Sequence, residues 1–342
     1  MEPLEPVGNN QNAPRTGLFL LLSLSVFTCF LMSLLVGPSS VGWRDMIALL
    51  FDPDIAPTHK QILLEIRTPR ALLGILVGGS LGLAGAALQG YLRNPLAEPG
   101  LLGVSATAAL GSVLTIHSGL VGLFALALPL GGIGAALLAV LLVQLLAGGQ
   151  NSILRLILAG IAISSFASAL TFLALNLAPD PFAAMEMMFW MMGSLSDRSF
   201  DHLLLASPFI LSGWALLLAL GRSLDALTLG EETAQTLGIH LQRLRLLIVL
   251  GLALSVGAAT AVVGSISFVG LVVPHLLRAR VGFRPSTLLT ASLLGGASLT
   301  LLADIGVRLL SPGPELKLGV LTALLGAPFF LVLIVNTRNE WK

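Results

Sequence analysis

The sequence is short of charge. Of its 342 residues, 10% are Asp, Glu, Lys or Arg, whereas a soluble globular chain carries about 25% charged residues. Such a composition cannot cover a water-facing surface, which excludes a soluble domain and a disordered chain. Cysteine is equally scarce, because Cys29 is the single one, and this excludes an internal disulfide. The same composition excludes a nucleic-acid binder, whereas the net charge of +1 says nothing about a polyanionic partner, because the 18 Lys and Arg nearly balance the 17 Asp and Glu.

Apolar residues take the place of charge. They make up 56% of the chain, and the mean hydropathy is +0.95. Ten membrane spans would use about 200 positions, close to what this share supplies. Apolar runs occur at 17–36, 71–91, 101–117, 120–146, 153–177, 203–220, 246–263, 266–277, 287–307 and 317–335. We predict an all-α polytopic membrane protein with about ten transmembrane helices over residues 17–336, between a cytoplasmic leader at 1–16 and a cytoplasmic tail at 337–342.

Two charge-free stretches are longer than one span, and each is divided into consecutive predicted spans. The stretch from Pro99 to Leu154 would extend about 84 Å as one helix, whereas the bilayer core is about 30 Å thick. We expect it to fold back at 117–119, where polar and glycine residues cluster. The charge-free run from Leu246 to Val273 is divided at 264–265, and the span that follows is short.

The distribution of basic residues indicates the orientation. With both termini in the cytoplasm, the inner segments hold 11 Lys and Arg and the outer segments hold 7, and basic residues favour the cytoplasmic side. Four of the outer basic residues follow the first span closely: Arg44, Lys60, Arg67 and Arg70. Their grouping suggests a task at the outer face.

Ionisable residues are almost missing from the middle of the spans. Asp304 and Arg308 come nearest, four residues apart near the outer end of the ninth span, where they can pair on one helix face. A proton-coupled carrier would be expected to hold a carboxylate in mid-span. Its absence disfavours an ion-coupled secondary transporter, although sodium coupling through backbone carbonyls stays open.

Signatures of catalysis are absent as well. The sequence has no G-x-x-x-x-G-K-[ST] phosphate loop, no H-E-x-x-H and no G-x-S-x-G. Its five histidines are dispersed without ligand spacing. We therefore predict that the chain is not an enzyme, holds no metal or other cofactor, and receives any energy for active transport through another subunit.

The longest polar stretch on the inner side is 222–243. Thr228 and Glu231 have capping-box spacing, and Gly238 can supply the left-handed residue that ends a helix. These signals predict a short helix over 229–237 outside the bilayer. It is either a plain connector or a docking element that offers a small apolar face to a soluble partner, formed by Leu229, Ala234, Leu237 and Ile239.

Small and hydroxylated residues recur at helical spacing. Gly74, Gly78 and Gly82 begin a stripe with a small residue at every fourth position, which lets helix backbones approach closely in lipid. In the fifth span, hydroxyl side chains fall on one helix face, where they either bond to nearby backbone or line a permeation path: Ser164, Ser168 and Thr171.

Five blocks closely resemble the FecCD/BtuC-type permease family of ATP-binding-cassette importers for iron-siderophore, haem or cobalamin. The first is RTPRALLGILVGGSLGLAGAALQGYLRNPLAEPGLLGVSATAALG, over 67–111. The others, in the family's order, are FWMMGSL, SFVGLVVPHLLR, LLADIGVR and ELKLGVLTALLGAPFFL. The resemblance covers about residues 18–336.

The resemblance implies a type II importer architecture with ten helices per permease and both termini inside the cell. Two permeases, here two copies of this chain as a homodimer, would work with two ATP-binding-cassette ATPase subunits and an external substrate-binding protein. The complex would lie in the inner membrane of a bacterium. The path between the permeases would be nearly inert, which fits the missing mid-span charge.

The family's functional residues map onto particular positions of this chain. The loop between the sixth and seventh helices, which contacts the ATPase, corresponds to 222–243 and favours docking by its 229–239 portion. The arginines that meet acidic residues of the binding protein correspond to Arg67, Arg70 and Arg308; the alternative is that they extend to the outer headgroups. The cytoplasmic gate corresponds to Asn94 and Leu96 and, where the sequence departs from the family pattern before Arg155, to Asn151 and Ser152.

These observations favour a permease subunit that moves a metal chelate or cobalamin by alternating access, driven by ATP hydrolysis on separate subunits. The alternative is an ion-coupled secondary transporter of a small solute. An intramembrane enzyme or a channel is disfavoured, because no nucleophile constellation and no paired pore motif occur in the sequence.

Overall fold

The computed structural model describes residues 13–37, 39, 41–51, 57–124, 126–148, 153–310 and 316–337. Within these ranges every regular element is helical, as the sequence predicts. Asn151 and Ser152, half of the predicted gate, lie outside the described residues.

Seven helical segments are long and apolar enough to cross a membrane. They are α1 (Ala13–Leu35), the segment ending in α4 (Thr68–Leu92), α6 (Ala127–Ala147), α7 (Ile153–Asn176), α9 (Phe200–Ala219), α12 (Leu241–Leu252) with its continuation through α13 (Ala258–Val263), and α15 (Pro285–Leu310). The chain is therefore a polytopic helical membrane protein.

The remaining predicted spans correspond to α5 (Val104–His117), α14 (Val269–Arg278) and α16 (Leu318–Thr337). Both predicted chain breaks are confirmed, since α5 ends at His117 and α13 ends at Val263, one residue before Gly264. A helix of 10 residues such as α14 rises about 15 Å, half the bilayer core. The count of ten crossings stays a prediction, because α5 and α14 are too short to span the core alone.

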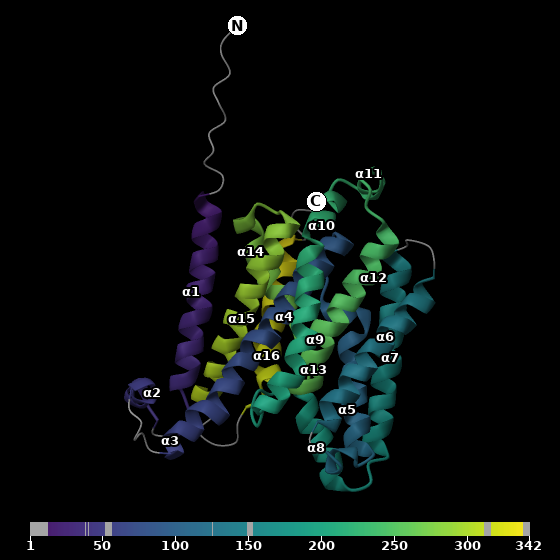
Figure 1. Ribbon diagram of the computed structural model, residues 1–342. Helices are drawn as coiled ribbons and strands as arrows, with labels where there is room; N and C mark the ends of the chain where they lie inside the picture. Colours follow the sequence, from purple (N-terminus) through teal and green to yellow (C-terminus); the bar gives the residue numbers. More distant parts are fainter. Residues whose placement is uncertain are drawn as a thin grey trace.

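The helices run between two ends of the molecule (Figure 1). At one end α1 begins and α16 ends, beside α10 (Gly221–Leu227) and α11 (Glu231–Thr236). At the opposite end lie α2 (Trp43–Phe51), α3 (Pro57–Gln61) and α8 (Pro181–Met191). From α3 the chain continues through a π-helical turn at Ile62–Arg67 directly into α4, so much of the expected outer loop is helix.

The stripe of small residues places α4 in close contact with α15. A Cβ added at Gly78 would collide with the carbonyl oxygen of Gly296, and one added at Gly82 with that of Ser292. The hydrophobic effect does not drive helices together in lipid, so this backbone approach supplies the packing. The stripe thus has the packing role that the sequence predicts, and it makes α4 the buried centre of the bundle.

Candidate functional site

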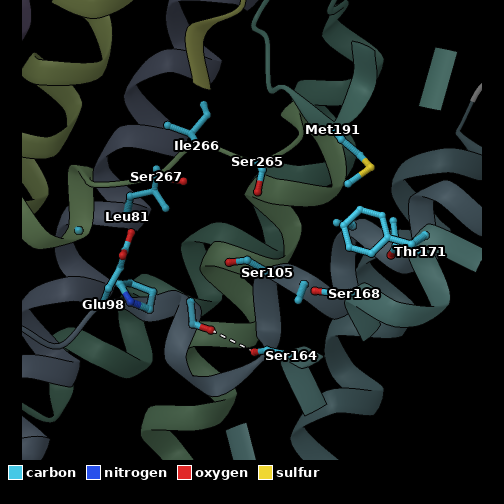
Figure 2. A pocket seen from close by; sticks show the side chains of 16 residues that line it. Leu81, Glu98, Ser105, Ser164, Ser168, Thr171, Met191, Ser265, Ile266 and Ser267 are labelled. Carbon is cyan, nitrogen blue, oxygen red and sulfur yellow. Dashed lines mark hydrogen bonds between the residues drawn. The ribbon is translucent and has the colours of Figure 1, made fainter. Parts of the chain in front are cut away.

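A cavity of about 330 Å³ lies between α4, α5, α7 and the chain that leads into α14. Figure 2 shows it lined by hydroxyl side chains on several sides, with a carboxylate at one wall. The hydroxyls belong to Ser105, Ser164, Ser168, Thr171, Ser265 and Ser267. A cluster of polar groups inside an apolar bundle is unusual, because each polar group costs free energy in a low-dielectric surrounding. This cavity is therefore the candidate site.

The three hydroxyl residues predicted on one face of the fifth span form the α7 wall of this cavity. Thr171 is buried and donates to the carbonyl of Ala167 in its own helix, at 2.9 Å. Ser164 donates across to the carbonyl of Gly100, at 3.4 Å, and Ser168 is exposed. Ser164 and Thr171 thus bond to nearby backbone, as one of the two predictions has it, and the lining of a permeation path stays a prediction.

Glu98 supplies the carboxylate, and sequence reasoning missed it. Its Oε1 accepts a hydrogen bond of 3.0 Å from the backbone N–H of Phe268, the residue before α14. Phe268 has φ +68°, which aims the chain into the helix. The first N–H groups of a helix have no partner within it, so the Glu98 oxygen supplies an acceptor at the start of α14.

The depth of Glu98 follows from the length of α14. The helix ends on the same side as α11 (Figure 1) and rises about 15 Å from the Glu98 contact. Glu98 therefore lies at the far end of α14 from Arg278, about 15 Å along the helix axis. The sequence signal for Glu98 was its position between Ala97 and Pro99, directly before the long charge-free stretch. Glu98 reaches the cavity only because residues 93–103 return from the end of α4 into the bundle.

A second polar contact attaches this descending segment to α14. The side-chain amide of Gln89 donates to the carbonyls of Ala97 and Gly270, at 3.3 and 3.4 Å. Its oxygen accepts a hydrogen bond of 2.6 Å from Arg278, at the end of α14. Glu98, in the segment after α4, therefore holds the start of α14, and Gln89, in α4, holds its end at Arg278.

The predicted gate residues Asn94 and Leu96 lie just after α4, away from the cavity lining. The Asn94 side-chain oxygen accepts a hydrogen bond of 2.9 Å from Leu96 N–H, which is the local turn that asparagine favours. Arg93 ends α4 with φ +50°. A gating role for Asn94 and Leu96 stays a prediction.

The capping box predicted at the 222–243 segment does not form. The Thr228 hydroxyl donates to the Asp225 carbonyl, at 2.7 Å, and α11 begins after Gly230. The Glu231 carboxylate instead accepts from Arg93, at 2.8 Å. Arg93, at the end of α4, lies near Glu231 only in the folded chain. There it binds the carboxylate that the capping box would have used. The left-handed turn predicted at Gly238 does occur, with φ +86°.

The predicted apolar face of this segment divides into two. Ala234 is fully buried and Ile239 packs against the core. Leu229 and Leu237 expose 65% and 61% of their surface. An incoming partner would therefore meet these two leucines, next to the Arg93–Glu231 ion pair.

Asp225 ties α10 to the start of α15. Its carboxylate accepts hydrogen bonds from the N–H and hydroxyl of Ser286, at 2.8 and 2.7 Å, and from Arg284, at 2.8 Å. Burial raises the pKa of Asp225, but the hydrogen bonds from Arg284 and Ser286 outweigh it and leave this pKa below its usual value.

A lowered folded-state pKa makes this junction sensitive to acid. The stabilisation from Asp225 is complete above the unfolded pKa of about 3.9 and is lost as the pH falls through the lower folded-state value. We expect the protection of the amides in 221–227 against hydrogen exchange, taken relative to the unstructured rate at the same pH, to fall below about pH 4, and Asp225→Asn to show low protection at neutral pH already. Equal protection of the two chains at neutral pH would contradict this.

The three arginines predicted to dock a binding protein are turned inward at the end opposite α11. Arg67 exposes 4% of its surface and donates to the carbonyls of Leu34, Leu35 and Val41. The last carbonyls of a helix have no partner within it, so Arg67 satisfies those at the end of α1.

The other two arginines share one acid. Asp304 exposes 1% of its surface and receives Arg70 and Arg308, each at 2.8 Å. This confirms the predicted pairing of Asp304 with Arg308. Arg308 also donates to the carbonyls of Ser33 and Val36. The cluster therefore fastens the end of α1 to α4 and α15, and the docking role stays a prediction.

The bundle of long apolar helices around a polar cavity is the architecture of a polytopic membrane protein. Residues 24–336 match the FecCD transport family. The chain is 39% identical over 336 residues to the hemin transport system permease protein HmuU of Yersinia pestis, covering 97% of this chain and 99% of that protein. It is 37% identical over 325 residues to the Fe(3+) dicitrate transport system permease protein FecD of Escherichia coli, covering 95% and 100%.

A solved structure shows the same arrangement. It is described as an inward-facing conformation of a metal-chelate type ABC transporter, and it superposes with a TM-score of 0.83 at 34% identity, covering 94% of this chain and 99% of that one. The chain belongs to the FecCD transport family and is the permease subunit of an ATP-binding-cassette importer.

Proposed function

We propose that the chain carries a metal chelate inward, either siderophore-bound iron, haem or the cobalt chelate cobalamin. The cargoes printed for its relatives, hemin and ferric dicitrate, support this class. The observation that carries the proposal is the hydroxyl-lined cavity inside the apolar bundle. A bulky chelate delivered by a separate protein needs a polar passage without strong ligands, and serine hydroxyls provide that.

The transport step would be alternating access driven from the α11 side. ATPase subunits that close on ATP would push on Leu229 and Leu237, which are exposed on either side of α11. The Arg93–Glu231 pair joins α11 to the end of α4. From there the descending segment leads to Glu98 and its bond to Phe268, at the cavity wall. Asn94 and Leu96, and with them Asn151 and Ser152, would form the cytoplasmic gate on this route.

The finer assembly is part of the same proposal. Ten crossings with both termini in the cytoplasm of a bacterium would place α11 inside and the arginine cluster outside. A second copy of the chain would close the open side of the cavity, which exposed Ser168 supports. An external binding protein would dock at the outer end, where Arg70 keeps 13% of its side chain exposed and where complementary charge sets register more than affinity.

Reconstituted vesicles test the function. The chain is co-purified with its ATPase subunit and supplied with the binding protein encoded for the same system, and uptake of hemin and of ferric dicitrate is measured. We expect uptake of one probe to require ATP and to stimulate ATP hydrolysis. Uptake driven by an ion gradient without ATP would support the secondary transporter instead and overturn the proposal.

Docking of the ATPase gives a separate prediction. Leu237→Asn should weaken co-purification of the ATPase subunit by about tenfold or more, because it removes an exposed apolar contact. Leu237→Met is the matched control, since it keeps an apolar side chain of similar size, and it should retain the subunit. Loss in both variants, or in neither, would contradict a docking role for this leucine.

A further inference from the structure

A second pocket lies at the α11 end of the bundle, and it shares no lining residue with the hydroxyl-lined cavity. Its volume is about 250 Å³, several times the share of about 30 Å³ that one water takes in the liquid. It lies between the end of α4, the chain before α11, the end of α14 and the start of α15. Two arginines line it, Arg93 and Arg278, together with Gln89, Thr228 and apolar side chains.

Arg278 carries a charge that no carboxylate of the described chain neutralises. Its Nη2 donates a hydrogen bond of 2.6 Å to the side-chain oxygen of Gln89, which is neutral, and its buried Nε has no hydrogen-bond partner. At the same end of the bundle, Arg93 and Arg284 each pair with a carboxylate at 2.8 Å. The C-terminal end of α14 favours a cation but supplies no acceptor to this Nε. A buried donor without an acceptor costs free energy, so the position favours a bound anion.

Arg93 adds a second positive charge to the same lining. Gln89 and Arg93 are four residues apart on α4 and therefore share one helix face, and the bond from Arg278 to Gln89 brings the end of α14 to that face. Glu231 pairs with Arg93 but does not line the pocket, and among the described residues no other acid does. The lining is therefore positive.

The rest of the lining suits a phosphate that is attached to an apolar body. Phe283, Pro285 and Leu288 are apolar, and Phe283 exposes 68% of its surface, so the pocket reaches the outside of the bundle. Arginine binds phosphate oxygens through charge-assisted hydrogen bonds, and basic pockets between membrane helices bind lipid headgroups.

We propose that this pocket binds a phosphate group, supplied either by an anionic lipid of the membrane leaflet at this end or by free phosphate. The phosphate accepts from the Nε of Arg278. Because Thr228 and Arg93 line the same pocket, the bound group joins α14 to α4 and to the 222–243 segment. The site is independent of the cargo that the transport cavity carries.

Lipid titration of the complex with its ATPase subunit tests the site. Native mass spectrometry compares phosphatidylglycerol with phosphatidylcholine, whose phosphate carries its own cation, and calorimetry measures the binding of inorganic phosphate. For a lipid site we expect a Kd for phosphatidylglycerol at least about tenfold below that for phosphatidylcholine, the usual effect of a charge-assisted hydrogen bond. Arg278→Gln should remove this preference.

Arg280→Gln is the matched control. Arg280 is exposed two residues further on, donates to the carbonyl of Leu276 at 3.1 Å and does not line the pocket. The variant removes the same charge from the same end of α14, so it should keep the preference. Equal loss in the two variants would show general attraction to a basic surface and overturn the proposal.

The two sources of phosphate give different results. A preference for phosphatidylglycerol that only Arg278→Gln removes assigns the site to a lipid. Binding of inorganic phosphate that the same variant abolishes, without a lipid preference, assigns it to free phosphate. A native complex that neither prefers phosphatidylglycerol nor binds inorganic phosphate would overturn the proposal.

Gly90→Leu provides a second variant that leaves both arginines in place. Gly90 lines the pocket, and a Cβ there would meet Leu224 and Pro285 at 3.7 Å, an ordinary contact distance. The rest of the leucine side chain would take up pocket space, so binding of whichever phosphate ligand the native complex takes up should weaken by about tenfold. If Arg278→Gln does not retain the ATPase subunit, unchanged binding in Gly90→Leu would overturn the proposal.

Discussion

Replacement of Asp304 with asparagine is expected to lower the free energy of unfolding by about 3 to 5 kcal/mol, the usual cost of removing one partner from a buried ion pair. The carboxylate is 1% exposed and bonds both Arg70 and Arg308 at 2.8 Å. Asparagine keeps the shape and removes the charge, so the buried guanidinium of Arg308 and the partly exposed one of Arg70 would lie close together without the carboxylate between them. Thermal unfolding of the detergent-solubilised chain measures the loss.

The control for this variant is Asp201→Asn. Asp201 is exposed at the start of α9, and such surface substitutions stay within about 0.5 kcal/mol. Hydrogen exchange should also rise at the end of α1 in the Asp304 variant, because Arg308 holds the carbonyls of Ser33 and Val36. Equal midpoints for the two variants would show that the cluster contributes no stability.

A methyl group at Gly82 is the second large change. The Cβ of Gly82→Ala would collide with the backbone carbonyl of Ser292 on α15, which cannot turn aside as a side chain can. The helices would have to separate along their closest approach. We expect a loss of about 3 kcal/mol, at the upper end of the usual cost of overpacking, seen as a lower unfolding midpoint.

Gly134→Ala provides the matched control. Gly134 lies in α6, and a Cβ there would meet no atom within 4 Å in the described structure. Alanine is favoured over glycine inside a helix by about 0.8 to 1 kcal/mol, so this variant should be as stable as the native chain or slightly more so. A comparable loss at both positions would mean that helix flexibility, and not the contact with α15, makes glycine necessary.

Much of the fold is readable from the sequence, because it depends on local properties. Apolar runs that are long enough to cross the bilayer must form helices, because only a helix satisfies its own backbone hydrogen bonds there. The helix breaks near Gly119 and Gly264 occur where these runs are too long for a single crossing. The stripe at Gly78 and Gly82 predicts close helix contact without naming the partner helix. The predicted capping box at Thr228 was wrong because a contact distant in sequence replaces the local one: Arg93 binds the Glu231 carboxylate.

The candidate site depends on contacts that no local pattern contains. The hydroxyls of Ser164, Ser168 and Thr171 share a helix face by their spacing alone, and the sequence determined that face. Glu98 became part of the same cavity only because the chain after α4 returns into the bundle and meets the start of α14.

The division between sequence and tertiary structure has one physical reason. Membrane residence, helix positions and close-packing faces follow from hydrophobicity and periodicity, which are properties of neighbours along the chain. The inward bonding of Arg67 and Arg308, the pairing of Arg93 with Glu231 and the contact of Glu98 with Phe268 follow from which partner lies nearest in space. A buried charge must find its counter-group wherever the fold places one, so the sequence supplied these few charges and the tertiary structure decided their partners.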